Sequence, residues 1–209
     1  MKKIAITQKL VKDNQYHEVR NVLDIRWAKL FNKLGYLPVL LPSHYDFRVY
    51  FDTMRIEGII LSGGNDLSLI SNDELSIERD AVEKKIIEYA IRKSIPVFGV
   101  CRGMQLIADY FRGKIKKVKN HARTEHRITA SNGTRFREEI RKLNKVKSFH
   151  NYGVTDIDEE NFIIAAFSED GVVEAIEHKS YRIWGQMWHP EREYPFSKMD
   201  IEIIKNYFG

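Results

Sequence analysis

Hydrophobic and polar positions in the first half of the chain follow two alternating patterns. Short runs of β-branched and other apolar residues predict buried strands over 3–7, 36–41, 58–61 and 95–100. Apolar residues at helical spacing predict helices over 18–34, 73–93 and 102–111, and a short helix or turn over 47–55. Such alternation is typical of a mainly parallel sheet with helices on both faces. We therefore expect an α/β fold, a three-layer sandwich with this sheet at its centre.

The pattern changes after Gly113. Short strand-like runs cover 114–119, 126–130, 146–149, 162–167, 172–177 and 182–187, and a helix over 197–208 closes the chain. Asn132-Gly133 and Asp170-Gly171 are typical turn pairs, and the second lies where a hairpin would join two of these runs. We expect a small antiparallel region in this half. No linker, repeat or low-complexity segment interrupts the chain, so residues 1–209 are predicted to form one domain.

Composition narrows the classes of function. Apolar residues make up 43% of the chain, which suffices for a full core, and a single cysteine rules out an internal disulfide framework. No stretch approaches the roughly 20 apolar residues of a membrane span, and the first apolar run is too short for a secretion signal. We expect a cytoplasmic protein without membrane contact. The net charge of +5 is modest, which favours an anionic small molecule over nucleic acid as the ligand.

The single cysteine, Cys101, lies where the strand over 95–100 gives way to the helix over 102–111. Gly99 and Gly103 flank it, and a nucleophile on a tight strand-to-helix turn needs small neighbours because backbones pass close to it. The positive N-terminal end of the helix would favour the thiolate, which is the reactive form. These residues alone leave two interpretations open: a catalytic nucleophile and a buried structural cysteine.

Among the seven histidines that could act as a base, His189 stands apart. It follows the predicted strand over 182–187 and precedes Pro190, which ends the strand and fixes the turn. Glu191 could orient the imidazole and stabilise its charged form, as the third member of a Cys-His-acid triad. On spacing alone, His189-Pro190-Glu191 can equally be an ordinary turn.

Four short motifs resemble, in the same order, those of the class I glutamine amidotransferases, which have a flavodoxin-like fold. They are Ser62-Gly63-Gly64-Asn65-Asp66, Gly99-Val100-Cys101-Arg102-Gly103-Met104-Gln105, Ser148-Phe149-His150 and Trp188-His189-Pro190-Glu191. The resemblance implies a catalytic triad of Cys101, His189 and Glu191, and an oxyanion hole formed by backbone N–H groups of Gly64 and Arg102. It implies substrate contacts from Gly63, Asn65, Gln105, Ser148, Phe149 and His150. It implies no cofactor and no metal ion.

Within that family the chain is most similar to the γ-glutamyl hydrolase branch, which includes γ-glutamyl-γ-aminobutyrate hydrolases. Glu78-Arg79-Asp80 resembles a pattern of this branch. The opening residues also resemble those of hydrolases in bacterial capsule phosphoramidate synthesis, which implies γ-glutamyl-CDP-amidate as the substrate. The residues that carry this second resemblance are 6–10, Tyr16, Glu18, Arg20 and Asp24.

The basic run over 112–123 follows the predicted nucleophile helix, where it could border the pocket. One interpretation is recognition of a phosphate- or nucleotide-bearing leaving group by Lys and Arg, and the other is a solvated charged face. His121, Arg123 and Tyr152 are the candidate leaving-group contacts. Tyr152 stands where many relatives have glutamine, and the glycine pair lacks the following proline that many relatives show. These two departures leave the identity of the substrate undetermined, whereas all three residues of the triad are present.

Three functions are compatible with the sequence. The first is a stand-alone hydrolase of a small γ-glutamyl substrate, with a phosphate- or nucleotide-bearing leaving group favoured over γ-aminobutyrate. The second is a glutaminase subunit that delivers ammonia to a separate synthetase partner. The third is a catalytically silent binding module, against which the intact Cys101, His189 and Glu191 argue. A homodimer and a synthetase partner are both compatible with these functions.

Overall fold

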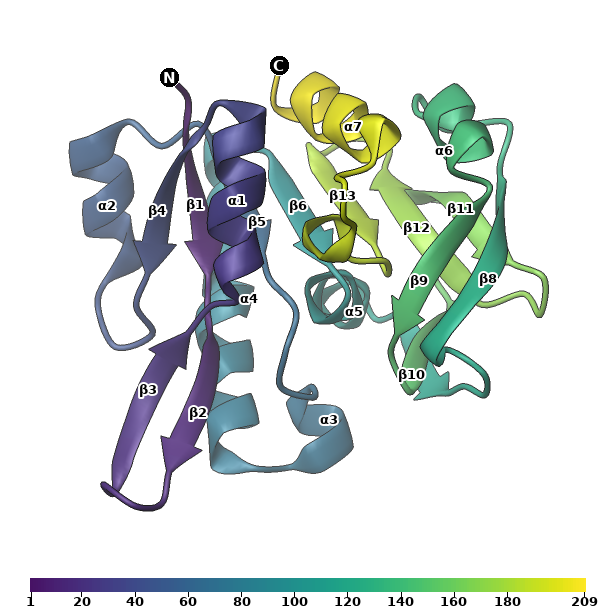
Figure 1. Cartoon of the computed structure of the whole chain (residues 1–209). Coiled ribbons are helices and arrows are strands. Elements are labelled where there is room, and N and C mark those ends of the chain that lie inside the picture. Colours follow the sequence, from purple (N-terminus) through teal and green to yellow (C-terminus); the bar gives the residue numbers. More distant parts are fainter.

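The computed structural model describes residues 1–209 and places one large sheet between two layers of helices (Figure 1). The strands are β1 (Lys3–Thr7), β2 (Lys9–Asp13), β3 (Glu18–Val22), β4 (Leu37–Leu41), β5 (Gly58–Leu61), β6 (Val97–Val100), β7 (Lys114–Lys117), β8 (Ala122–Ala130), β9 (Lys145–Phe149), β10 (Tyr152–Asp156), β11 (Phe162–Ser168), β12 (Val173–His178) and β13 (Ile183–Gln186). The helices are α1 (Ile25–Leu34), α2 (Phe47–Met54), α3 (Ser68–Ser71), α4 (Glu74–Lys93), α5 (Arg102–Tyr110), α6 (Arg137–Leu143), η1 (Pro190–Arg192) and α7 (Lys198–Phe208).

The first half of the sheet is parallel. Strands β4, β1, β5, β6 and β13 lie side by side in this order, all in one direction. Alternate side chains enter two separate cores, because successive residues of a strand face opposite sides. Ala5, Ile59 and Val97 pack with α2, α4 and α5, whereas Ile60 and Phe98 pack with α1 and α7. The predicted three-layer α/β fold is confirmed.

The second half of the sheet is antiparallel. Strand β12 pairs with β13 and β11, and β8 joins β11 to β9. The predicted turn at Asp170-Gly171 lies between β11 and β12, and Gly171 has a φ of +81°, which glycine adopts without a steric penalty. Strand β10 pairs with both β12 and β7. The predicted antiparallel region is therefore confirmed, but it is larger than expected, with six of the eleven strands, and it is continuous with the parallel sheet.

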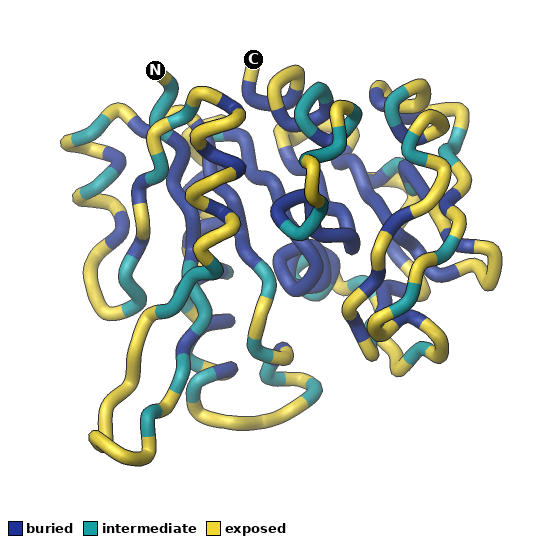
Figure 2. The backbone as a smooth tube through the Cα atoms, in the orientation of Figure 1, coloured by how far each residue is buried: buried dark blue, intermediate teal, exposed yellow.

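The predicted helix over 18–34 is wrong in its first part. Residues Glu18–Val22 form strand β3, which pairs with β2 in a hairpin that projects from the body and is largely exposed (Figures 1 and 2). Helix α1 begins at Ile25, after Asp24 accepts a hydrogen bond from the Arg26 backbone N–H as its N-cap. Val22 and Leu23 fit the helical spacing of the residues that follow them, which hid this boundary.

Five further elements were not predicted: strands β2 and β10 and the short helices α3, α6 and η1. Each is brief, and the apolar spacing in such short segments cannot distinguish a helix from a strand or loop. None of the helices combines the length and the apolar character that crossing a bilayer would require.

Candidate active site

Cys101 lies in a strained turn between β6 and α5. Its φ of 53° and ψ of −106° fall outside the regions that non-glycine residues favour. A Cβ atom added to Gly103 would lie 2.1 Å from the Leu61 carbonyl oxygen, and one added to Gly99 would lie 2.8 Å from that of Gly103. The turn therefore requires glycine at both positions, in agreement with the expected need for small neighbours.

His189 reaches the same edge of the sheet from a distant part of the sequence. Strand β13 lies parallel to β6, and the Cys101 backbone N–H donates to the Gln186 carbonyl at 2.8 Å. A Cβ atom added to Gly63 would lie 2.9 Å from His189 Cε1 and 3.7 Å from Cys101 Cβ, so the two side chains meet over this glycine. His189 Nδ1 lies 2.6 Å from Glu191 Oε1, and both residues are buried.

The His189 imidazole interacts with both Cys101 and the Glu191 carboxylate. Burial disfavours its charged form, but the electrostatic and hydrogen-bond interactions with these two residues outweigh burial and raise the pKa of His189 to about 9. His189 therefore carries a proton at neutral pH. Because the folded chain binds this proton more tightly than the unfolded chain, its contribution to the free energy of unfolding is complete below pH 6.5 and is lost as the pH rises to about 9.

Replacing Glu191 with glutamine should lower the pKa of His189, because the amide keeps an acceptor but removes a negative charge. The fall in the free energy of unfolding between pH 6.5 and about 9 should shrink by about 1 kcal/mol. An NMR titration of the imidazole and denaturant unfolding across this range measure both quantities. Glu193→Gln is the matched control, since Glu193 pairs with Lys147 at 3.1 Å instead. An equal His189 pKa in Glu191→Gln and Glu193→Gln would contradict the inference that the Glu191 carboxylate raises this pKa.

The loop after β5 presents backbone N–H groups beside Cys101. Arg79 of α4 donates to the carbonyl oxygens of Ser62 at 2.8 Å, Gly63 at 3.1 Å and Gly64 at 3.1 Å. The C=O and N–H of a trans peptide point in opposite directions, so the Gly64 N–H points away from Arg79. Gly64 lines the cavity above Cys101. Arg79 thus fixes the loop so that the Gly64 N–H, one of the two predicted oxyanion donors, points away from the Arg79 side chain.

Arg79 is part of a buried ion cluster. Its Nε donates to Glu83 at 2.9 Å, while Arg102 pairs with both Asp80 and Glu83. Burial lowers the pKa of Arg79 to about 10, so the guanidinium stays charged at neutral pH. Burial would raise the pKa of Glu83, but the two arginines outweigh it and hold that pKa below its ordinary value. The cluster joins the Gly64 loop to Arg102, the residue that carries the second predicted oxyanion donor.

A cavity of about 310 Å³ lies above Cys101, near the lower end of the range for small-molecule sites. Among the predicted site residues it is lined by Cys101, His189, Gly64, Arg102, Asn65, Gln105, Phe149, His150 and Tyr152. Arg192 also lines it and was not predicted. Its guanidinium lies 4.7 Å from the centre of the Phe149 ring, and its side chain is 27% exposed. Its place directly after Glu191, in the same turn as His189, was the available signal.

Two of the predicted substrate contacts also hold the walls of this cavity. The Gln105 side-chain amide donates to the Tyr152 carbonyl at 2.7 Å. The Asn65 amide accepts from the Leu10 N–H at 3.0 Å and donates to the Leu10 carbonyl at 2.9 Å, which ties β2 to the loop after β5. Both side chains therefore have a positioning role in this structure.

Four predicted contacts lie outside the lining of this cavity. Gly63 lines a neighbouring cavity with His189 and Glu191, and the Ser148 hydroxyl donates to the His121 carbonyl. His121 is buried and faces Glu174, and Arg123 is exposed outside the cavity. No residue of the basic run over 112–123 lines this cavity, but the run borders its wall: Lys117 pairs with Tyr152, and the Val118 N–H donates to the Asn151 carbonyl at 2.9 Å. Residues Lys114–Lys117 of the run form β7, which pairs with β10 and leaves its lysines in solvent.

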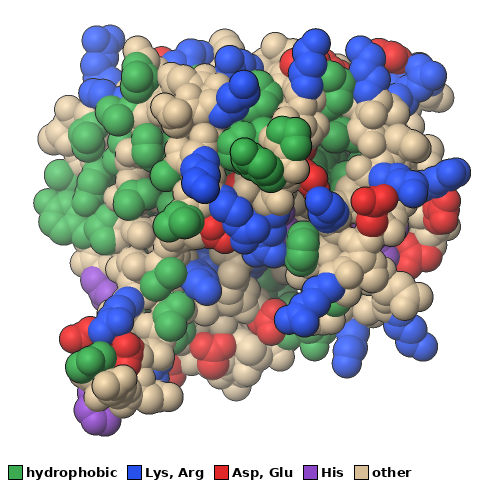
Figure 3. Space-filling view, in the orientation of Figure 1, with side chains coloured by type: hydrophobic (Ala, Val, Ile, Leu, Met, Phe, Trp, Pro, Cys, Tyr) green, Lys and Arg blue, Asp and Glu red, His purple; other side chains and the backbone are tan.

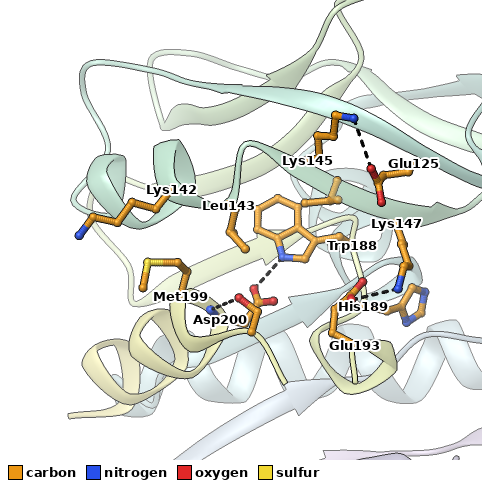
Figure 4. Close-up of a pocket in the computed structure, with 12 residues that line it drawn as sticks. Glu125, Lys142, Leu143, Lys145, Lys147, Trp188, His189, Glu193, Met199 and Asp200 are labelled. Carbon is orange, nitrogen blue, oxygen red and sulfur yellow. Dashed lines mark hydrogen bonds and ion pairs between the residues drawn. The ribbon is translucent and has the colours of Figure 1, made fainter. Parts of the chain in front are cut away.

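A second cavity adjoins His189 from the side of β9 and α7 (Figure 4). The Trp188 indole N–H donates to Asp200 Oδ1 at 2.8 Å, which anchors the residue before His189. Burial raises the pKa of Asp200 to about 7 against the opposing effect of this hydrogen bond. Lys145 and Lys147 pair with Glu125 and Glu193 at the rim, as Figure 4 shows.

Comparison with known proteins matches the chain to one peptidase family and to enzymes that act on glutamine or γ-glutamyl compounds. The family model of Peptidase C26 matches residues 3–191. A γ-glutamyl-CDP-amidate hydrolase of Campylobacter jejuni is 38% identical over 209 residues, which cover 99% of this chain and 97% of that protein. A glutamine-hydrolysing GMP synthase subunit of Methanosphaera stadtmanae is 33% identical over 184 residues, which cover 86% of this chain and 89% of that protein.

Solved structures share the fold. A GMP synthase subunit homologue from Thermoplasma acidophilum superimposes with a TM-score of 0.74 at 22% identity, over 100% of this chain and 93% of that chain. A glutamine amidotransferase from Thermotoga maritima gives a TM-score of 0.68 at 15% identity, over 98% of this chain and 83% of that chain. At these identities the likeness supports the fold alone.

Proposed function

Because the chain belongs to the peptidase C26 family and is a γ-glutamyl hydrolase or amidotransferase-type enzyme, we propose that it hydrolyses a γ-glutamyl amide through a thioester on Cys101. The observation that carries the proposal is the meeting of Cys101 with the buried His189–Glu191 pair over Gly63. A nucleophile, a base and an acid that orients the base are the parts that acyl transfer through a covalent intermediate needs.

In the first step the Cys101 thiolate attacks the γ-carbonyl carbon, and the carbonyl electrons move onto its oxygen. The N–H groups of Gly64 and Arg102 receive this oxyanion, held in place by Arg79 and the buried cluster. The C–N bond then breaks as protonated His189 gives its proton to the leaving nitrogen. The raised pKa of His189, about 9, keeps that proton available at neutral pH.

In the second step water hydrolyses the thioester. His189, now neutral, takes a proton from the water as the oxygen attacks the γ-carbon, and the C–S bond breaks to return the thiolate. The γ-carboxylic acid formed in this way loses its remaining proton to solvent, glutamate leaves as the carboxylate, and His189 is protonated again. Glu191 holds the ring at 2.6 Å throughout, so the same nitrogen faces Cys101 in both steps.

We further propose that the leaving group carries phosphate, with γ-glutamyl-CDP-amidate as the substrate. Two observations support this: the 38% identity to the hydrolase of that name, and the place of Arg192 in the lining of the Cys101 cavity. Lys and Arg side chains also gather near the middle of the face in Figure 3. Guanidinium groups bind phosphate oxygens through charge-assisted hydrogen bonds.

Arg192→Gln should reduce kcat/KM for a γ-glutamyl phosphoramidate nucleotide by about 10- to 100-fold more than for glutamine, because a charged hydrogen bond is lost only with the first substrate. Glutamate release from both substrates, from γ-glutamyl-γ-aminobutyrate and from a γ-glutamyl peptide, measures the preference. Arg141→Gln is the control, since Arg141 lies exposed on α6 and pairs with Glu138.

Two outcomes would contradict the proposed leaving group. One is a preference of the unmodified protein for γ-glutamyl-γ-aminobutyrate, and the other is an equal loss on all substrates in Arg192→Gln. Neither would affect the proposed thioester chemistry, which depends on Cys101 and His189.

The relatives that are GMP synthase subunits favour one alternative, a glutaminase subunit that passes ammonia to a synthetase partner. A stand-alone hydrolase turns over its substrate without any added protein. A glutaminase subunit would release glutamate from glutamine slowly alone, with a strong increase when the partner is present. Turnover of purified chain on glutamine and on the phosphoramidate nucleotide therefore separates the two functions.

A further inference from the structure

Three histidines surround one buried glutamate beside the candidate active site. Glu174 of β12 is 0% exposed, and its Oε1 lies 3.2 Å from His121 Nδ1, 3.3 Å from His126 Nε2 and 3.6 Å from His150 Nε2. His121 and His150 are buried as well. The backbone hydrogen bond from the His150 N–H to the His121 carbonyl, at 3.0 Å, holds these two residues side by side.

Hydrogen bonds on the far side of two rings define which nitrogen faces Glu174. His121 Nε2 lies 3.1 Å from the Asp170 carboxylate, which only accepts, so Nε2 carries the hydrogen. His150 Nδ1 lies 2.9 Å from the Tyr152 carbonyl and therefore also donates. In a neutral imidazole the other nitrogen then has a lone pair. These two nitrogens lie 3.2 Å and 3.6 Å from Glu174 Oε1, which is itself an acceptor, but neither is directed at it well enough for a hydrogen bond.

The cluster therefore brings acceptors together without a donor between them. His121 Nδ1, His150 Nε2 and both Glu174 oxygens make no hydrogen bond of good geometry, although all are buried. Buried polar groups are normally satisfied, so this arrangement needs an explanation. Extra protons on all three rings would place three positive charges beside two carboxylates, Glu174 and Asp170, in a largely buried cluster. One divalent cation would satisfy all of these lone pairs at once.

We propose that His121, His126, His150 and Glu174 bind one divalent transition-metal ion, for which zinc is the best fit. Zinc prefers imidazole nitrogen and carboxylate oxygen in tetrahedral sites, and bonds of about 2.0–2.1 Å separate neighbouring ligand atoms by about 3.3 Å. The distances from Glu174 Oε1 to the three nitrogens, 3.2–3.6 Å, agree with this separation. The ligand atoms of His121, His150 and Glu174 all lie within 4.8 Å of one another.

Two further features match a structural metal site. Asp170 bonds the outer nitrogen of His121, as carboxylates commonly do for metal-binding histidines. His126 Nε2 lies 3.3 Å from Glu174 Oε1 but outside the group of three, so its ring would move inward to complete a tetrahedral shell with no open position for catalysis. Sequence patterns did not predict a metal ion here. Glu174 lies in a buried strand, and its three partners come from other segments, so only the fold brings them together.

The ion would support one wall of the Cys101 cavity. His150 lines that cavity, and the Tyr152 carbonyl accepts from both His150 Nδ1 and the Gln105 side-chain amide. A metal ion on His150 Nε2 would therefore fix the segment from Phe149 to Tyr152. Its role is positioning, and it does not depend on the proposed identity of the leaving group.

Cobalt titration of the full chain tests the site. After removal of metal by a chelator and dialysis, Co²⁺ should give visible d–d absorption of four-coordinate strength that saturates at about one equivalent. One equivalent of Zn²⁺ should abolish the absorption and raise Tm. Absence of a saturable Co²⁺ spectrum in the unmodified protein would overturn the proposal and leave a hydrogen-bonded cluster only.

Variants locate the bound ion. Glu174→Gln should weaken Co²⁺ binding by about 100-fold or more, whereas Glu177→Gln should retain it. Glu177 is a matched control because it lies on the same strand, is buried and bonds Thr134 and Arg135. If Glu174→Gln does not fold, His126→Asn serves the same purpose, since the His126 side chain is 16% exposed. Equal affinity in the ligand variant and in Glu177→Gln would refute the assignment.

Discussion

Cys101→Ala is expected to reduce hydrolysis of γ-glutamyl amides by about 10⁴-fold or more, because no other side chain in the cavity can form the thioester. Glutamate release under saturating substrate measures the loss. The fold should persist, because alanine keeps the Cβ atom and removes only the sulfur. His189→Ala should reduce the rate of hydrolysis by a similar factor. The double variant should be only slightly slower than either single variant, since the two residues act as a unit.

The covalent intermediate gives an independent test. An electrophilic glutamine analogue should add its mass to the unmodified protein at Cys101 and leave Cys101→Ala unmodified. Arg102, Gln105 and the Gly64 loop remain in the alanine variant, so substrate binding should survive the loss of turnover. Retention of more than about a hundredth of the original rate in Cys101→Ala would exclude the thiol as the nucleophile.

The neighbourhood of Cys101 was predictable because its causes are local. The strand over 95–100, the helix after it and the two glycines follow from residues within one short stretch, and the structure has each of them. The contact between Cys101 and His189 depends on tertiary structure instead. Hydrophobic spacing predicts that 182–187 is a strand, but it does not reveal that β13 inserts beside β6. Only the family resemblance placed these residues in one site.

The predicted helix was wrong at residues 18–22 because the apolar residues there fit two patterns. Val19, Val22 and Leu23 satisfy both a strand and the helical spacing that Trp27, Leu30 and Phe31 continue. The exposed hairpin β2–β3 has little core of its own, so its pairing depends on hydrogen bonds that hydropathy cannot reveal. The Asp24 N-cap was the local signal of the true helix start.

The basic run over 112–123 shows why charge alone did not identify the residues that line the Cys101 cavity. Its lysines are spread along β7, where alternate side chains face solvent, and the cavity cation comes from Arg192 in the turn after β13. His121, near the end of the same run, is buried against Glu174 of β12, and its carbonyl accepts a hydrogen bond from the Ser148 hydroxyl of β9. Position along the sequence predicted proximity to the site, but only tertiary structure sets the direction of each side chain.

Arg79→Met should lower the free energy of unfolding by about 3–5 kcal/mol, because it leaves Glu83 with one of its two buried partners and removes the donor to three loop carbonyls. In the folded fraction kcat should fall by about 10²-fold or more, since the Gly64 N–H loses its fixed orientation. Denaturant unfolding and glutamate release measure the two effects.

Arg92→Met is the matched control for Arg79→Met, because Arg92 lies on the same helix and pairs with Glu88 in solvent, with side chains 63% and 54% exposed. Exposed pairs of this kind contribute at most about 1 kcal/mol, so this variant should keep both stability and rate. Arg79→Lys separates charge from geometry: lysine keeps the charge, but one ammonium group cannot reach Glu83 and three consecutive carbonyls together. We expect it to recover part of the stability while kcat stays low. Full recovery of kcat by lysine would show that charge alone suffices, and that the fork of hydrogen bonds does not position the loop.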